Sequence, residues 1–227
     1  MGRGLMSRIF RLLSAVGGGG ILLIVVLWCP VFANQVDSMQ QVGVEQLLEA
    51  IDQKASSIKT IDCSFAQKRF LSVFKNPVSF TGRLVLDRPT KLRWEIIKPI
   101  PSVLVFNGSK GMHCQGEGEP RTFDLGSDPI MRIVSQQLWS WLSGNYSKLR
   151  QDYSIALQAE NILSLTPKEA GTARYISTID ITFEPTTMQP SKVVIYESPE
   201  NRTEITFFDY QLNTPVDHSL FSMCRPE

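Results

Sequence analysis

Residues 82–96, with the sequence GRLVLDRPTKLRWEI, decide the fold. Apolar side chains alternate with charged ones on either side of a proline turn: Leu84, Leu86, Leu92, Trp94 and Ile96 face one way, and Lys91, Arg93 and Glu95 face the other. Because successive side chains of a strand point to opposite faces, this period of two predicts two strands. Pro89 fixes its own φ and disfavours helix in the residue before it, which places a tight turn at Asp87–Thr90. The alternation predicts antiparallel strands with one covered face and one face in water.

The same periodicity extends through most of the chain on both sides of this stretch. Val103–Phe106 is apolar throughout, and Asn107-Gly108 behind it is a strong signal for a two-residue hairpin. We count roughly nine strands, and all their connections are short except one. Short connections predict antiparallel neighbours.

Two segments have helical spacing instead. Apolar residues recur every three or four positions over Val44–Ile58, with charged residues on the other face. The second helix is marked by Asp128 as N-cap, Pro129 at the first helical position and Gly144 past the end. Its apolar stripe contains Ile130, Ile133, Val134, Leu138, Trp141 and Leu142.

These elements predict a mainly β (α+β) fold, an open antiparallel half-barrel whose concave face is covered by helices. A sheet this wide twists and curls, and its concave apolar face must be covered. The two amphipathic helices are the available covers. Such a shape either fills its interior with side chains or leaves a pocket for an apolar ligand.

The N-terminus has the order of a secretory signal peptide. Three arginines precede a glycine spacer, an apolar run over residues 21–28, and Val31-Phe32-Ala33. The apolar run is shorter than the roughly 20 residues of a spanning helix, and Trp28 before Cys29 argues against a lipidated cysteine. We expect cleavage after Ala33, and residues 34–227 then form one soluble, secreted, periplasmic domain.

The remaining 194 residues contain 20 cations, 22 acidic residues and three cysteines. This charge balance offers no basic patch for nucleic acid. Cys63, Cys114 and Cys224 allow at most one disulfide between them, and their spacing matches no metal-ligand pattern. We expect unpaired cysteines here, with one disulfide as the alternative.

Catalytic motifs are absent from the sequence. His113 and His218 are the only histidines, and no nucleophile elbow, zinc-protease motif, phosphate loop or dinucleotide-binding glycine pattern occurs. We therefore predict a protein that is not an enzyme and that needs no cofactor or metal.

Several short motifs occur in the order found in one family. They are SFAQK at 64–68, GRLVLDRP at 82–89, LRW at 92–94, Pro99, FNGSK at 106–110, LSLTP at 163–167, Asn213 and Leu220-Phe221. Over nearly the whole predicted mature chain, the sequence resembles the LolA family of outer-membrane lipoprotein carrier proteins.

This resemblance implies an eleven-stranded incomplete barrel under a helical lid, with a cavity for the acyl chains of a lipoprotein. Arg88 matches the family's arginine, which hydrogen-bonds to the lid backbone and holds the empty cavity closed. The expected cargo-binding residues are Leu84, Leu86, Leu92, Trp94, Ile96, Ile133, Leu138, Trp141 and Leu142; ordinary core packing explains the same pattern. The implied partners are acylated lipoprotein or lipid cargo, an inner-membrane ABC-type donor and an outer-membrane acceptor, with the carrier a monomer.

Other functions stay open at this point. The chain ends six residues after Phe221, where family members continue into a C-terminal extension, which puts delivery to the usual receptor in doubt. A carrier of another lipid-linked product, such as a glycolipid or an aryl polyene lipid, is the nearest alternative. A LolA-like lipid sensor and an acyl-ester hydrolase are the others, although a second sensor domain and a catalytic triad are missing.

Overall fold

The computed structural model describes residues 31–116, 118–142 and 144–223. Its helices are α1 (Val31–Ser56), α2 (Pro129–Leu142), α3 (Ala170–Ala173) and the 3-10 helices η1 (Tyr146–Gln151) and η2 (His218–Phe221). Its strands are β1 (Thr60–Phe70), β2 (Val78–Asp87), β3 (Lys91–Lys98), β4 (Ser102–Asn107), β5 (Lys110–Gln115), β6 (Arg121–Asp124), β7 (Tyr153–Ala159), β8 (Ile162–Pro167), β9 (Thr178–Phe183), β10 (Pro190–Tyr196) and β11 (Arg202–Leu212).

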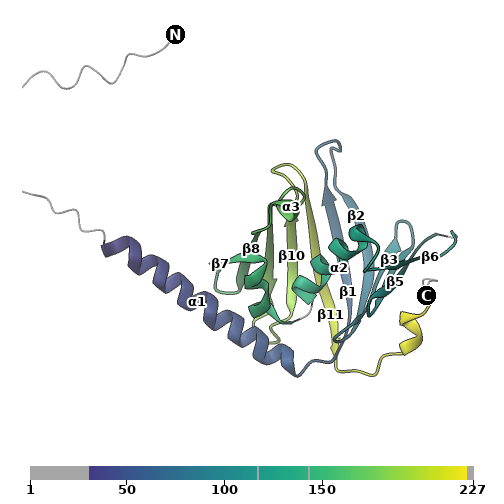
Figure 1. The fold of residues 1–227 in the computed structure, drawn as a ribbon, viewed down its shortest axis with the longest axis horizontal. Helices are drawn as coiled ribbons and strands as arrows, with labels where there is room; N and C mark the ends of the chain where they lie inside the picture. The colour runs from purple at the N-terminus through teal and green to yellow at the C-terminus, as the bar shows by residue number, and fades with distance from the viewer. Residues whose placement is uncertain (1–30, 117, 143, 224–227) are drawn as a thin grey trace, which may run out of the picture.

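All these strands belong to one open antiparallel sheet. The order is β6-β5-β4-β3-β2-β1-β11-β10-β9-β8-β7, so two meanders join where β1 pairs with β11. The sheet curls around α2 (Figure 1). The predicted fold class is confirmed. The sheet has eleven strands where the periodicity predicted roughly nine, and the short β6 is among those not predicted.

The long connection crosses the concave side of the sheet. β6 and β7 are the two edges of the sheet, so residues 125–152, which carry α2 and η1, must pass from one edge to the other (Figure 1). We call α2 and η1 together the lid. The N-terminal helix α1 packs against β7 and η1 from the side of that edge.

Helix α1 is longer than the sequence predicted. Its apolar face is buried at Val44, Leu47, Leu48 and Ile51, as the periodicity indicates, but the helix begins at Val31. No proline interrupts residues 31–43, so the helix continues beyond its apolar face. The predicted signal peptide lies outside the described residues except for residues 31–33, and cleavage stays a prediction. Among the described helices, none combines the length and apolarity needed to cross a membrane.

The concave face of the sheet forms the main core. Side chains from both meanders, α1 and the lid make one continuous apolar cluster. Gly82 is needed in this face because Phe65, its partner on β1, lies across it. A Cβ at Gly82 would lie 2.3 Å from the Phe65 ring and 2.1 Å from the Glu95 carbonyl oxygen, so no other residue fits without a shift.

The convex face of β3 is not in water, which makes that prediction wrong for two residues. Arg93 and Glu95 are only 1% and 2% exposed, and Arg93 Nε donates to Glu95 Oε2 at 2.9 Å. The C-terminal segment turns back over this face and packs Leu220 and Phe221 against the sheet. Arg93 Nη1 also donates to the carbonyl oxygens of Leu220, at 3.1 Å, and Met223, at 2.9 Å. A segment distant in sequence thus covers charges that the alternation alone places in solvent.

The expectation of unpaired cysteines is correct for one residue and wrong for another. Cys63 is a buried free thiol in the concave core, and burial raises its pKa to about 12. Cys114, on β5, is disulfide-bonded. Spacing along the chain could not show this, because the fold sets which cysteines meet.

Candidate functional site

Arg88 sits in the turn between β2 and β3 and reaches the ends of two helices. Its Nη1 donates to the carbonyl oxygens of Ala55 at 3.0 Å and Ile58 at 3.2 Å, and its Nη2 donates to the Leu142 carbonyl oxygen at 2.9 Å. Ala55 lies in the last turn of α1, and Leu142 is the last residue of α2. We call these three hydrogen bonds the clasp, because they join both helices to one turn of the sheet.

The clasp brings a charged donor to carbonyl oxygens at the ends of two helices; the Ala55 oxygen also accepts from the Ile58 amide at 3.1 Å. The last carbonyls of an α-helix have no intrahelical donor and carry the negative end of the helix dipole. A guanidinium offers several donors in one plane, which lets a single side chain serve two helix ends. Burial lowers the pKa of Arg88 below its ordinary value, and the nearby Tyr146 and Tyr210 oppose this shift.

The end of α2 is shaped for close approach to Arg88. Asp128 caps the start of the helix, where its Oδ1 accepts from the Met131 amide at 3.0 Å, as predicted. Gly144, after the end, has a φ of +72°, a conformation that favours glycine. A Cβ at Gly144 would lie 2.6 Å from the Ala55 Cβ and 2.9 Å from both Arg88 Nη atoms. Glycine therefore allows both the turn and the contact.

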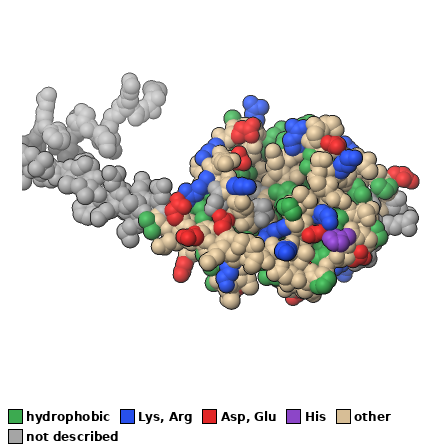
Figure 2. Space-filling model, turned by 60° about the horizontal axis from the view of Figure 1, so that its bottom comes forward, with side chains coloured by type: hydrophobic (Ala, Val, Ile, Leu, Met, Phe, Trp, Pro, Cys, Tyr) green, Lys and Arg blue, Asp and Glu red, His purple; other side chains and the backbone are tan. Residues whose placement is uncertain are grey.

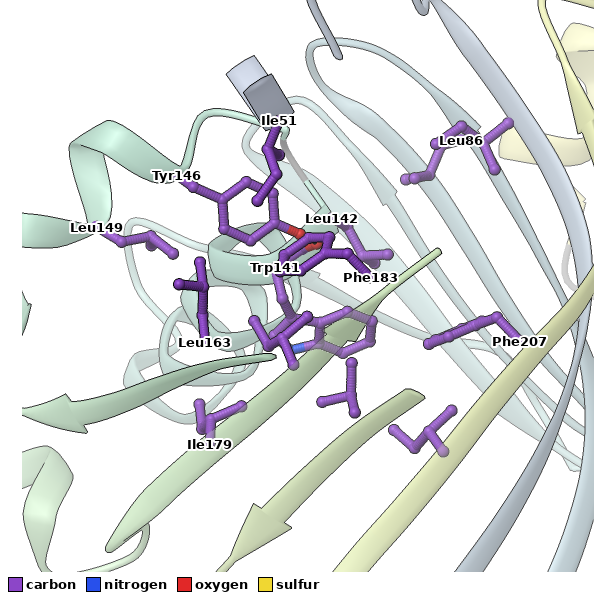
Figure 3. Close-up of a cluster of buried hydrophobic side chains, with 14 of the residues drawn as sticks. Ile51, Leu86, Trp141, Leu142, Tyr146, Leu149, Leu163, Ile179, Phe183 and Phe207 are labelled. Carbon is purple, nitrogen blue, oxygen red and sulfur yellow. The ribbon is translucent and has the colours of Figure 1, made fainter. Parts of the chain in front are cut away.

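Trp141 fills the middle of the concave face. Figure 3 shows its indole pointing from α2 toward the sheet, near Phe207 of β11. Its ring lies 5.7 Å from that of Phe207 and 5.9 Å from that of Trp94, between centroids. Aromatic pairs at such spacings contribute stabilisation beyond that from burying apolar area. The lid therefore acts as an apolar plug in the half-barrel.

Tyr146 fixes the other half of the lid. Its hydroxyl donates to the Trp141 carbonyl oxygen, and its ring packs 5.1 Å from that of Phe183. Its amide donates to Asp52 Oδ1 of α1 at 2.9 Å. Complete burial raises the pKa of Tyr146 well above its ordinary value. The phenol consequently stays neutral and serves as a donor within the lid.

The interior is filled in this closed arrangement. The space between Arg88, Trp141, Tyr146 and the sheet amounts to about 10 Å³, about the space of one water and far too small for an acyl chain. An open, more polar cleft of about 590 Å³ lies beside the lid and also borders Arg88. An apolar ligand can enter the concave face only if the lid moves.

Two buried donors of the site have no hydrogen-bond partner among the described residues. They are Arg88 Nε and Trp141 Nε1. A buried donor without an acceptor costs about 1 to 3 kcal/mol. The clasp and apolar packing therefore stabilise the closed lid. The burial of these two donors opposes it, because opening would return them to water.

The structure brings most of the predicted cargo-binding residues together. Those in the concave cluster are Leu84, Leu86, Leu92, Trp94, Ile96, Leu138, Trp141 and Leu142. Ile133 does not join them, because its side chain is 44% exposed on the outer side of α2. Ile130 of the predicted stripe is exposed as well, whereas Met131 and Trp139, which lie outside that stripe, pack against the cluster with Val134.

Other residues of the site were missed. Phe207 and Phe183 lie on strands that the sequence predicted, and their alternation could have identified them. Tyr146 and the Ala55 and Ile58 carbonyls gave no signal, because their roles depend on how the lid and α1 end meet Arg88.

The histidines do not form a recognisable catalytic group. His113 Nε2 lies 3.2 Å from Ser102 Oγ, and His218 Nδ1 lies 3.3 Å from Asp87 Oδ2 and 3.1 Å from Lys91 Nζ. Within the described part of the chain, no group of three or more histidine, cysteine or acidic residues could hold a metal ion.

Comparison with known proteins places the chain in a family. The family described as "Outer membrane lipoprotein carrier protein LolA" matches residues 56–224. The outer-membrane lipoprotein carrier protein of Pseudoalteromonas translucida is 25% identical over 184 residues, which cover 79% of this chain and 83% of that protein. That of Chromohalobacter salexigens is 28% identical over 149 residues, covering 64% and 67%.

Solved structures similar to this chain include a LolA superfamily protein from Nitrosomonas europaea, with 10% identity and a TM-score of 0.41 over 76% of this chain and 96% of that one. Lipoprotein LppX of Mycobacterium tuberculosis has 10% identity and a TM-score of 0.42 over 76% and 98%. The family match covers Arg88, the lid and all eleven strands. This chain therefore belongs to the LolA family of outer-membrane lipoprotein carrier proteins.

Proposed function

We propose that this protein carries acylated lipoproteins through the periplasm, from an inner-membrane ABC-type donor to an outer-membrane acceptor. The observation that supports this most is the clasped lid: a plug of apolar side chains covers an apolar concave face and is held at one end by three hydrogen bonds from Arg88. Membership in a family of carrier proteins agrees with such a role.

The lid and the acyl chains would occupy the same apolar surface. Moving Trp141 and Leu142 off the sheet exposes a face lined by Leu84, Trp94 and Phe207. Burying about ten methylenes there contributes roughly 8 kcal/mol before ordering costs, at about 0.8 kcal/mol each. Cargo binding therefore exchanges one set of apolar contacts for another, and the clasp sets the balance between the closed and loaded forms.

A fluorescent acyl-chain displacement assay tests this proposal. We expect saturable binding of an environment-sensitive fatty-acid probe, displacement by a diacylated peptide, and no hydrolysis of acyl esters in a parallel assay. A glycolipid and an aryl polyene lipid serve as competing cargo. Failure of every acyl ligand to bind would refute the carrier role. If only the glycolipid displaces the probe, the cargo is a glycolipid and not a lipoprotein.

The periplasmic location rests on the predicted signal peptide. We expect the protein purified from the periplasm of an expressing diderm bacterium to begin at Asn34 without an acyl group. Intact-mass measurement checks this, and a chain that retains residues 1–33 in the membrane fraction would contradict it.

A further inference from the structure

The hairpin between β1 and β2 presents apolar side chains to water at its tip, which we define as residues 71–77. Val73 is 80% exposed and Phe74 is 57% exposed. β3 pairs with β2 only from Thr81 onward, so the last residues of this hairpin extend past the β3–β4 turn. Figure 1 shows the hairpin projecting at the top of the molecule. The tip is therefore a protrusion and not part of a packed surface.

Hydrogen bonds hold the tip in this exposed position. The Phe74 amide donates to the Leu71 carbonyl oxygen at 2.9 Å, and the Ser72 amide donates to Asn201 Oδ1 at 2.8 Å. At the base of the tip, the Arg202 guanidinium lies 3.8 Å from the centroid of the Phe70 ring. A turn ordered in this way has already lost most of the conformational entropy that binding would otherwise cost.

The part of this hairpin nearest the tip carries charges of one sign. Residues 64–83 contain four cations and no acidic residue. Arg83 pairs with Asp62 and Arg69 with Glu197. Lys75, in the tip, and Lys68, beside it, are exposed. By contrast, the lower end of the molecule carries interspersed charges of both signs (Figure 2).

The neighbouring β3–β4 turn repeats this combination at the same end of the sheet. Ile97 and Ile100 are 45% and 60% exposed, and they flank the exposed Lys98. Antiparallel pairing of β2 with β3 places this turn on the side of the β1–β2 tip. Apolar side chains beside lysines match the interface of an anionic bilayer, where the apolar groups enter the headgroup region and the cations meet lipid phosphates.

We propose that the tip of the β1–β2 hairpin docks this protein on the surface of a bilayer containing anionic phospholipids, with the β3–β4 turn as a secondary contact. This docking does not depend on cargo in the concave face. It would let the carrier meet a membrane with the end of the sheet opposite the Arg88 turn.

Vesicle co-sedimentation of the protein purified from the periplasm tests this docking. We expect binding to phosphatidylcholine vesicles that contain about one third phosphatidylglycerol, and weaker binding to phosphatidylcholine alone. The double variant Val73→Ser/Phe74→Ser should lower the partition coefficient roughly tenfold or more. Lys75→Glu should lower it roughly fivefold, on the anionic vesicles only.

Val42→Ser is the matched control, because Val42 is 55% exposed on α1, outside both the hairpin and the lid; it should bind vesicles as the wild type does. Thermal melting verifies that each variant is folded. Wild-type protein that remains in the supernatant, or a Val73→Ser/Phe74→Ser variant that sediments equally well, would overturn the proposal.

Sedimentation velocity tests the alternative that the tip binds a second copy of this chain. If the protein forms a dimer that the tip variant loses, while vesicle binding is unchanged in that variant, the tip is a contact between two copies and the proposal is overturned. Acyl-probe binding should be the same in all these variants, so loss of docking and failure of the carrier role are distinguishable.

Discussion

Replacing Arg88 by leucine removes every donor of the clasp while leaving an apolar side chain of moderate size. Of the three hydrogen bonds, the one from Nη2 to the Leu142 carbonyl oxygen joins the sheet to the lid, whereas the two from Nη1 join it to the end of α1. Only the Leu142 bond must break when α2 moves. The cost of its loss therefore falls mainly on the closed form.

A hydrogen bond from a charged donor contributes about 1.5 to 3 kcal/mol net, which corresponds to a shift of roughly 10-fold to more than 100-fold in the equilibrium between closed and open lids. Because cargo binds only where the lid has moved, Arg88→Leu should bind an acyl probe more tightly and release it more slowly. Arg88→Lys keeps the charge but not the planar group, so it should have a smaller effect.

Stopped-flow release of a fluorescent acyl probe to acceptor vesicles measures this change. Arg174→Leu is the matched control, since Arg174 is an exposed arginine near α3 and its loss should leave release unchanged. Thermal melting checks that each variant is folded. Unchanged release from a folded Arg88→Leu protein would refute the gating role of the clasp.

Three further predictions concern the surroundings of the site. Gly144→Ala places a Cβ 2.9 Å from the Arg88 Nη atoms at a φ of +72°. It should therefore lower the melting temperature and tighten acyl-probe binding, as Arg88→Leu does. Wild-type affinity for the probe would show that the three hydrogen bonds of the clasp form despite the added Cβ. Arg93→Met should lower the free energy of unfolding by about 3 to 5 kcal/mol, because it removes the guanidinium that donates to the buried Glu95 carboxylate. Arg93→Met/Glu95→Leu should recover most of this loss in urea titrations; no recovery would indicate that the contacts of Arg93 with the C-terminal segment dominate. The pKa of Cys63, raised to about 12 by burial, should keep the folded thiol unreactive toward a disulfide reagent at pH 8. From pH 9 to 12 the unfolded thiol ionises while the folded one does not, so stability should fall with rising pH, and less steeply in Cys63→Ala.

The sheet was predictable because its determinants are local. Alternation around the Asp87–Thr90 turn and the hairpin signal at Asn107-Gly108 depend on neighbours in the sequence, and the strands follow them. The caps of α2 at Asp128 and Gly144 were likewise visible, because each acts on the backbone within one turn.

The rest of the site depends on long-range contacts that no local pattern carries. The prediction that Ile133 faces the concave cluster was wrong. The apolar stripe on this helix is wider than the face that contacts the sheet, so the sequence does not determine how the helix is rotated about its axis. Arg93 and Glu95 were placed in water because their cover comes from the C-terminal segment. Arg88 was identified by resemblance to a family, since its partners on α1 and α2 are backbone carbonyls, which every residue has.

The passage of residues 125–152 from β6 to β7 fixes the lid to both margins of the sheet. A cover attached in this way cannot swing free like a flap on one hinge, since each end moves with a different edge strand. Widening the half-barrel to receive bulky cargo must draw the two margins apart and tighten the connection, whereas raising α2 requires slack in it. The length of this single segment therefore limits how thick a bundle of hydrocarbon the protein can enclose, and lengthening it by inserted residues should admit cargo with more or longer chains.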